Sequence, residues 1–157
     1  MTYTEKHLNE ARQIIESIDA DAIEDMVKFL AQVRDDGGRL FFLGVGGSAG
    51  NCSHAVNDFR KIVGVESYAP TDNISEFTAR TNDEGWKFTF LSWLKISKLN
   101  KKDALFILSV GGGNKKKKVS TNLIYAIDYA KKIKSRILGI IGKSEGYVKR
   151  FGHNVIV

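Results

Sequence analysis

The stretch that decides the fold is RLFFLGVGGSAGNCSH, residues 39–54. Its first part, Arg39 to Val45, is a short apolar run that is typical of a strand buried on both faces of a parallel sheet. Glycines from Gly44 to Gly47 break the run, and an amphipathic helical pattern follows directly. A strand, a glycine turn and a helix in this order present backbone N–H groups and the positive end of a helix dipole. The stretch therefore predicts an anion site at the end of a strand.

The same alternation continues on both sides of this stretch. Upstream, apolar residues at helical spacing predict two helices within residues 1–36, and residues 37–157 form the sheet core of a single domain. Downstream, short apolar runs predict strands near 66–70, 104–110, 136–142 and 154–157, with helices near 86–98 and 123–130 and a polar loop at 81–85. We expect an α/β fold: a doubly wound, mostly parallel, five-stranded, flavodoxin-like sheet with helices on both faces and the N-terminal helices packed on it.

Composition narrows the class of protein. A length of 157 residues suits one domain. No apolar run reaches the roughly 20 residues of a membrane helix, and the first ten residues lack a signal peptide pattern, so we expect a cytoplasmic chain with no membrane partner. The single cysteine, Cys52, excludes an internal disulfide. The net charge of +6 favours anionic partners, whether phosphosugars, nucleotides or nucleic acid.

A second glycine loop, Ser109 to Asn114, follows the strand expected at 104–110. Alone, the first loop also fits a loose dinucleotide fingerprint, with Glu66 about 20 residues on, or a tight turn without a ligand. Two such loops suit a compact phosphate cradle better than a dinucleotide, with Ser120 as a further hydroxyl donor. The tract Lys115 to Lys118 is interpreted as a solvated loop or as a cationic flap over the site. Other lysines are scattered without interleaved aromatic residues, which disfavours nucleic acid.

Two polar pairs are candidates for chemistry. His54 and Asp58 are four residues apart on the polar side of the helix after the first loop. The carboxylate is placed to abstract a proton next to a carbonyl, the pair has the spacing of divalent metal ligands, and a surface ion pair is the alternative. Asn82 and Asp83 are placed to hydrogen-bond sugar hydroxyls or to form an Asx turn.

Five motifs in this order resemble the SIS (sugar isomerase) domain of the phosphoheptose isomerase type, from about residue 8 to the end. They are GVGGSAGNCSH with Asp58, TND at 81–83, LFILSVGGGN at 105–114, STNLIYAI at 120–127 and ILGIIG at 137–142. The resemblance implies aldose–ketose isomerisation of sedoheptulose 7-phosphate to a heptose 7-phosphate through an enediol, in heptose biosynthesis. It also implies a homo-oligomer, a tetramer or a dimer, with sites shared between subunits.

The resemblance also implies roles for particular residues. Asp58 takes the place of the family's catalytic glutamate, and His54 with Asp58 takes the place of metal ligands, so zinc is a possible cofactor. The substrate-binding positions are Gly46, Gly47, Ser48, Asn82, Asp83, Ser109, Gly111 and Ser120. Val45 replaces the sugar-loop asparagine, and Val110 and Gly111 replace two phosphate-binding hydroxyl residues, so backbone amides and lysines are expected to hold the phosphate.

The end of the sequence departs further from the family pattern. Family members continue past the last strand into a helix that supplies a glutamine and the second acid/base histidine, and neither His153 nor His7 aligns with that histidine. Two functions follow: an isomerase whose partner acid comes from elsewhere, or a non-catalytic phosphosugar-binding module. The helix expected at 86–96 is apolar on nearly every side, so it is expected either to form part of an oligomer contact or to be fully buried within one subunit.

Overall fold

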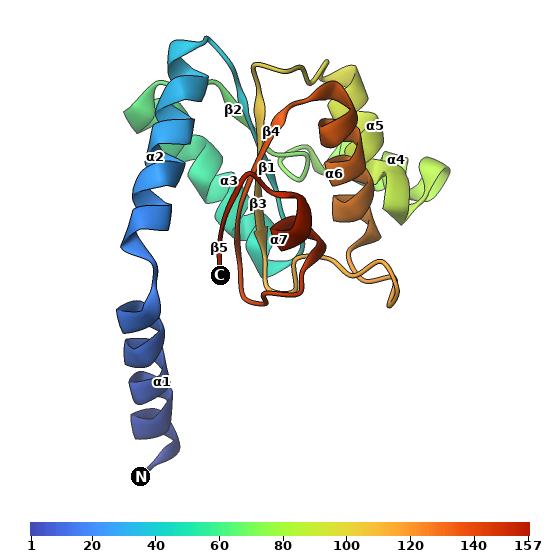
Figure 1. Ribbon diagram of the computed structural model, residues 1–157. Helices are drawn as coiled ribbons and strands as arrows, with labels where there is room; N and C mark the ends of the chain where they lie inside the picture. Colours follow the sequence, from blue (N-terminus) through green and yellow to red (C-terminus); the bar gives the residue numbers. More distant parts are fainter.

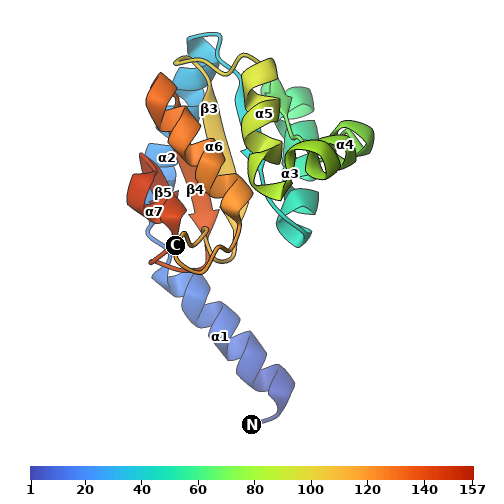
Figure 2. The same cartoon turned by 90° about the vertical axis from the view of Figure 1, so that its right-hand side faces the viewer.

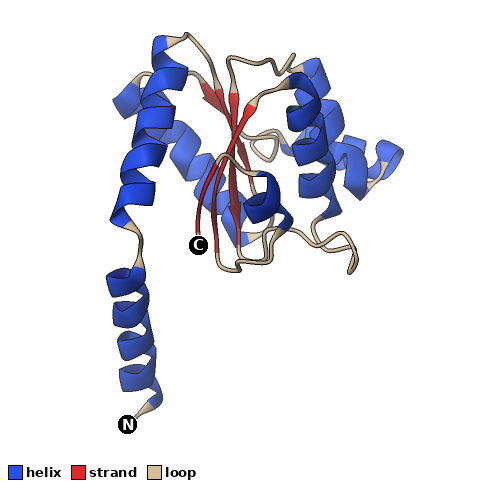
Figure 3. Cartoon of the chain, in the orientation of Figure 1, coloured by secondary structure: helices blue, strands red, loops and turns tan.

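The computed structural model describes all 157 residues. A five-stranded sheet forms its centre, with the strand order β2-β1-β3-β4-β5 and every neighbouring pair parallel. The strands are β1 (Leu40–Leu43), β2 (Ser67–Tyr68), β3 (Ala104–Ser109), β4 (Arg136–Ile141) and β5 (Asn154–Ile156). The predicted α/β class and parallel sheet are therefore confirmed (Figure 3).

Helices cover both faces of the sheet. They are α1 (Tyr3–Ser17), α2 (Ala20–Asp35), α3 (Gly47–Asp58), α4 (Ile74–Glu84), α5 (Thr89–Ile96), α6 (Thr121–Ile133) and α7 (Tyr147–Phe151), with a π-helix η1 (Phe59–Val63) after α3 and a 3₁₀ turn η2 (Trp86–Phe88) before α5. In Figure 1, α2 and α3 lie on one side of the sheet, and α4 to α7 lie on the other. None of these helices is long and apolar enough to cross a bilayer.

The two layers of the core follow from the alternation of side chains along each strand. Phe41 and Leu43 of β1 point into a cluster with residues of α5, α6 and α7. Leu40 and Phe42, one residue out of step, point into a second cluster with residues of α2 and α3. Because both faces of the strand are buried, the run is continuously apolar, as the pattern LFFL predicts.

The prediction that the N-terminal helices pack on the sheet is right for α2 and wrong for α1. Helix α2 buries Met26 and Val33, whereas α1 has no buried residue and projects away from the body (Figures 1 and 2). Local interactions stabilise α1 instead: a capping box between Thr2 and Glu5 and exposed ion pairs at i,i+4 spacing. Its apolar side chains, including Ile14 and Ile15, therefore remain exposed.

The predicted polar loop at 81–85 is also wrong, because residues 81–84 form the last turn of α4. The Asn73 side chain accepts a hydrogen bond from the Glu76 amide and caps the start of this helix. Arg80 then pairs with Glu76 and with Glu84, at i,i+4 spacing in both directions. Gly85, at φ +84°, ends the helix.

Candidate functional site

The two glycine loops leave the same edge of the sheet from neighbouring strands. β1 and β3 pair in parallel, with Leu43 opposite Ile107. The two strands therefore end at the same edge of the sheet. The first loop then leads to α3 on one face, and the second leads towards α6 on the other face (Figure 1). This divergence is a topological switch point, where open α/β sheets bind their ligands.

The first loop is a tight turn with an open outer side. A Cβ atom at Gly44 would stand 2.5 Å from the Ser48 carbonyl oxygen, so this position has no room for a side chain. Gly46 precedes α3 at φ +61°, and a Cβ atom at Gly46 or Gly47 would meet nothing within 4 Å. No side chain caps α3, and the Ala49 amide already donates to the Gly46 carbonyl oxygen. The amides of Gly47 and Ser48 are therefore free to donate to an anion.

The second loop is held by its own serine and by the segment after β4. The Ser109 hydroxyl oxygen accepts a hydrogen bond of 3.0 Å from the Gly112 amide. Three further amides, of Gly142, Tyr147 and Val148, donate to the carbonyl oxygens of residues 110, 113 and 112 at 2.9 to 3.0 Å. Gly112, at φ +63°, touches the backbone of Gly146, where a Cβ atom would come within 2.9 Å of the Gly146 Cα. The second loop is thus a rigid part of the sheet edge.

A cavity of about 310 Å³ lies between these loops, and we call it the strand-end cavity. It is lined by Ser48, Asn51, Leu108, Ser109, Val110, Ile140, Ile141 and Gly142. The structure therefore brings together Ser48 and Ser109, which are both predicted site residues. Sequence reasoning missed Asn51, one turn after Ser48, and Gly142, at the carboxyl end of β4; their positions next to a helix start and a strand end were the available signals. No lining side chain is ionisable.

The remaining loop positions lie around this cavity without lining it. Gly46 and Gly47 precede Ser48 on the exposed side of the first turn. Gly111 lines a neighbouring cavity of about 360 Å³. Ser120 precedes α6 in the left-handed conformation, at φ 51°, and its side chain does not cap the helix. Their roles in substrate binding stay predictions.

The side chains of His54 and Asp58 lie in contact on the exposed face of α3. The distance between His54 Nε2 and Asp58 Oδ2 is 3.2 Å, and the two side chains are 78% and 42% exposed. Asp58 lies seven residues after Asn51, so it is on the same helix face, about 10 Å further along the axis. A ligand anchored in the strand-end cavity would reach Asp58 by extending along α3.

His54 and Asp58 do not make up a complete set of ligands for a catalytic zinc ion. A catalytic zinc site takes three protein ligands, and no group of three or more His, Cys, Asp or Glu side chains is placed to hold a metal ion. His54 and Asp58 supply two donors, with Asn57 as their neighbour through a hydrogen bond to Asp58.

Asn82 and Asp83 are not at the strand-end cavity. Both side chains are exposed on the last turn of α4, and the Asn82 amide donates to the Asp83 carboxylate at 2.7 Å. Helix α4 contacts α5 and η2 on the α6 side of the sheet (Figure 2). Within one subunit these two residues are apart from Ser48 and Ser109.

A doubly wound parallel sheet with two glycine loops at its switch point defines an α/β protein with a ligand site at the strand ends. Comparison with known proteins makes the class specific: the model of the SIS domain matches residues 2–142. The chain belongs to the SIS domain family, as the motifs predict. Helix α1 and all strands except β5 lie within the matched residues.

Curated relatives of this chain are of the phosphoheptose isomerase type. Phosphoheptose isomerase 1 of Campylobacter jejuni is 26% identical over 161 residues, covering 98% of this chain and 83% of that protein. The phosphoheptose isomerase of Chlorobium phaeobacteroides is 30% identical over 131 residues, covering 79% of this chain. The aligned region is 55% of that second relative's length.

Solved structures confirm the fold. Phosphoheptose isomerase GmhA from Neisseria gonorrhoeae superposes with a TM-score of 0.80 at 21% identity, covering 98% of this chain and 82% of that chain. A phosphoheptose isomerase from Francisella tularensis gives 0.79 at 19% identity, with the same coverage. At these identities the likeness concerns the fold alone, and the residue roles remain predictions.

Proposed function

We propose that this protein is a phosphosugar isomerase that interconverts sedoheptulose 7-phosphate and a heptose 7-phosphate through an enediol. The observation that carries the proposal is the meeting of Ser48 and Ser109 from two glycine loops at one strand-end cavity. Its support is that relatives at 26–30% identity are named phosphoheptose isomerases. The phosphate would rest on the first-turn amides of α3 and on the two serine hydroxyls.

Asp58 is the proposed base in this reaction. Its carboxylate would take a proton from C1 of the ketose and return it to C2, while a second proton moves from the C1 oxygen to the C2 oxygen. Proton transfer by a positioned carboxylate is worth about 10²–10⁴ in rate. The transfer between oxygens needs a second group, which another subunit or further sequence would supply, because the strand-end cavity has no ionisable side chain.

The same observation favours a second candidate, a phosphosugar-binding module without turnover. A cavity lined only by neutral groups can hold a ligand, and Asp58 lies outside it, in contact with the exposed His54. Two solved structures that share the fold are the sugar isomerase domain of an RpiR transcription factor from Sphaerobacter thermophilus, with a TM-score of 0.68, and the NanR protein of Vibrio vulnificus complexed with ManNAc-6P, with 0.63.

One experiment separates the two candidates. The protein is incubated with sedoheptulose 7-phosphate in D₂O, and NMR follows both aldose formation and the entry of deuterium at the carbons next to the carbonyl. An isomerase produces both signals, Asp58→Asn abolishes both, and the exposed control Asp35→Asn changes neither. Turnover that survives Asp58→Asn excludes Asp58 as the base. Calorimetric binding without deuterium entry in the unaltered protein supports the binding module.

We further propose that the protein is a homo-oligomer, a tetramer or a dimer. Helix α1 leaves Leu8, Ile14 and Ile15 between 62% and 69% exposed, and Ile96 at the end of α5 is 71% exposed. A second copy would remove this apolar surface from water. It would also offer Asn82 and Asp83 to a neighbouring site. Light scattering at micromolar concentration tests the proposal, and a monomer there would contradict it.

A further inference from the structure

The tetralysine tract forms a small, well-defined hairpin. Asn114 and Val119 exchange two backbone hydrogen bonds of 3.0 Å, and the Lys117 amide donates to the Asn114 side chain at 2.9 Å. Lys118 closes the turn in the left-handed conformation, at φ 53°. The hairpin follows the second glycine loop directly, so its position is set by the bonds that tie that loop to the segment after β4.

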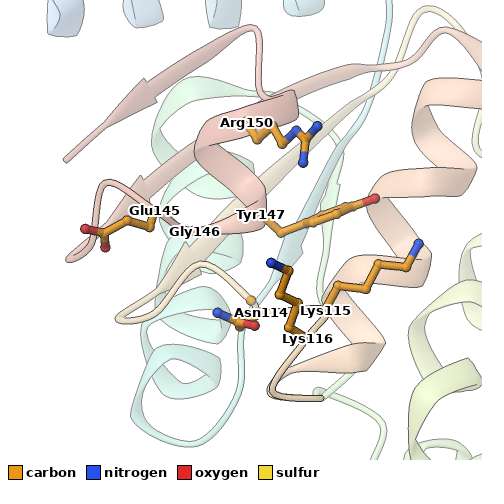
Figure 4. Close-up of a pocket in the computed structure, with 8 residues that line it drawn as sticks. Asn114, Lys115, Lys116, Glu145, Gly146, Tyr147 and Arg150 are labelled. Atoms are coloured by element: carbon orange, nitrogen blue, oxygen red, sulfur yellow. The ribbon is translucent and has the colours of Figure 1, made fainter.

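The hairpin faces α7 across a cavity of about 450 Å³, which we call the basic cavity. Its lining residues are Gly113, Asn114, Lys115, Lys116, Glu145, Gly146, Tyr147 and Arg150. In Figure 4 one of the two lysine side chains points from the hairpin towards Tyr147 and the other extends sideways along α6, whereas Arg150 lies on the far side of Tyr147 and Glu145 points away. Arg150 stacks on the Phe151 ring, with its guanidinium carbon 5.2 Å from the ring centroid. Three cationic side chains therefore line one cavity, around Tyr147.

These charges have no anionic partner in the protein. None of the ion pairs in the structure includes Lys115, Lys116 or Arg150. The neighbouring cavity of about 360 Å³ adds Lys117 and Lys143 without adding a carboxylate, since both cavities share Glu145. Like charges held close together repel one another, and a bound anion would offset that repulsion.

We propose that the basic cavity binds a phosphoryl group, separate from the phosphate that the proposed function places on the glycine loops. The guanidinium fork of Arg150 and the ammonium groups of two lysines are the donors that proteins use for phosphate. A volume of about 450 Å³ matches a small phosphorylated molecule. The phosphoryl group belongs either to the second phosphate of a bisphosphorylated sugar or to a separate phosphorylated ligand.

Calorimetry at low salt with three probes tests this proposal: inorganic phosphate, fructose 6-phosphate and fructose 1,6-bisphosphate. The variant combines Lys115→Ala with Lys116→Ala. The control combines Lys101→Ala with Lys102→Ala, which removes the same charge from the exposed turn before β3, at the opposite edge of the sheet. We expect the variant to lose about tenfold or more in affinity for the ligand of the basic cavity and the control to lose less than about twofold. Arg150→Gln should reproduce the loss.

The probes distinguish the two sources of the phosphoryl group. If it is a second sugar phosphate, the unaltered protein binds the bisphosphate about tenfold more tightly than the monophosphate, and the variant loses that preference. If it is a separate ligand, inorganic phosphate binds in two equivalents, and the variant retains one. Equal weakening by variant and control, or the absence of both a preference for the bisphosphate and a second equivalent of inorganic phosphate, overturns the proposal. Because binding is the readout, failure of the isomerase assay would not change this result.

Discussion

Replacing Gly112 with alanine tests whether the second glycine loop is held by backbone packing. Gly112 has φ +63°, which costs a residue with a Cβ atom about 1–2 kcal/mol. The added Cβ would lie 2.9 Å from the Gly146 Cα and 3.2 Å from the Ile141 Cδ1, and such overpacking costs about 1–3 kcal/mol. Alanine also lowers the conformational entropy of the unfolded chain relative to glycine, and this effect offsets about 0.5–1 kcal/mol of the loss. Urea unfolding should therefore give a loss of about 1–4.5 kcal/mol.

Gly50→Ala is the matched control for this substitution. Gly50 lies within α3, and a Cβ atom there would meet nothing within 4 Å. Alanine in a helix is favoured over glycine by about 0.5–1 kcal/mol, so this variant should be slightly more stable than the unaltered protein. If Gly112→Ala changes the free energy of unfolding by less than about 0.5 kcal/mol, the packing of the two loops is not what holds the site.

Three other sets of experiments test separate parts of the molecule. Asp103 is 1% exposed and accepts three hydrogen bonds from Arg39, so Asp103→Ala should lower the free energy of unfolding in urea by about 3 kcal/mol. Burial raises the pKa of the Cys52 thiol to about 12, so a thiol-reactive dye at pH 8 should label it only as fast as the chain unfolds. Above about pH 9 the unfolded chain ionises this thiol first, and stability should fall with a slope that Cys52→Ala reduces. Ser48→Ala combined with Ser109→Ala should weaken calorimetric phosphosugar binding by about tenfold or more, and unchanged affinity would place the phosphate elsewhere.

The strands of this fold were predictable because each one carries its own signal. The runs LFFL in β1 and ALFILS in β3 are apolar throughout, as strands covered on both faces must be, and glycines mark where the first turn begins. The meeting of Ser48 and Ser109 was also predictable in outline, since neighbouring parallel strands end at one edge. These inferences needed only local pattern and one rule of topology.

Other features depend on partners that a local pattern does not reveal. The residues TNDEG, 81–85, have a composition typical of a loop. The ion pairs of Arg80 with Glu76 and Glu84 nevertheless stabilise α4 as far as residue 84. Helix α1 has an apolar pattern like that of α2, yet nothing in the chain covers it. The basic cavity requires Arg150 to face Lys115 from 35 positions away, a proximity set by the contact of residues 112 and 146.

That contact between Gly112 and Gly146 makes residues 109–120 and 142–150 a single module for protein engineering. In the folded protein a side chain at either glycine would strike the other's backbone, so each loop is shaped to its counterpart. Grafting the lysine hairpin onto a relative would therefore fail if the first segment were moved alone. A chimaera that carries both segments would keep the three amide-to-carbonyl bonds between them and deliver the hairpin together with its arginine.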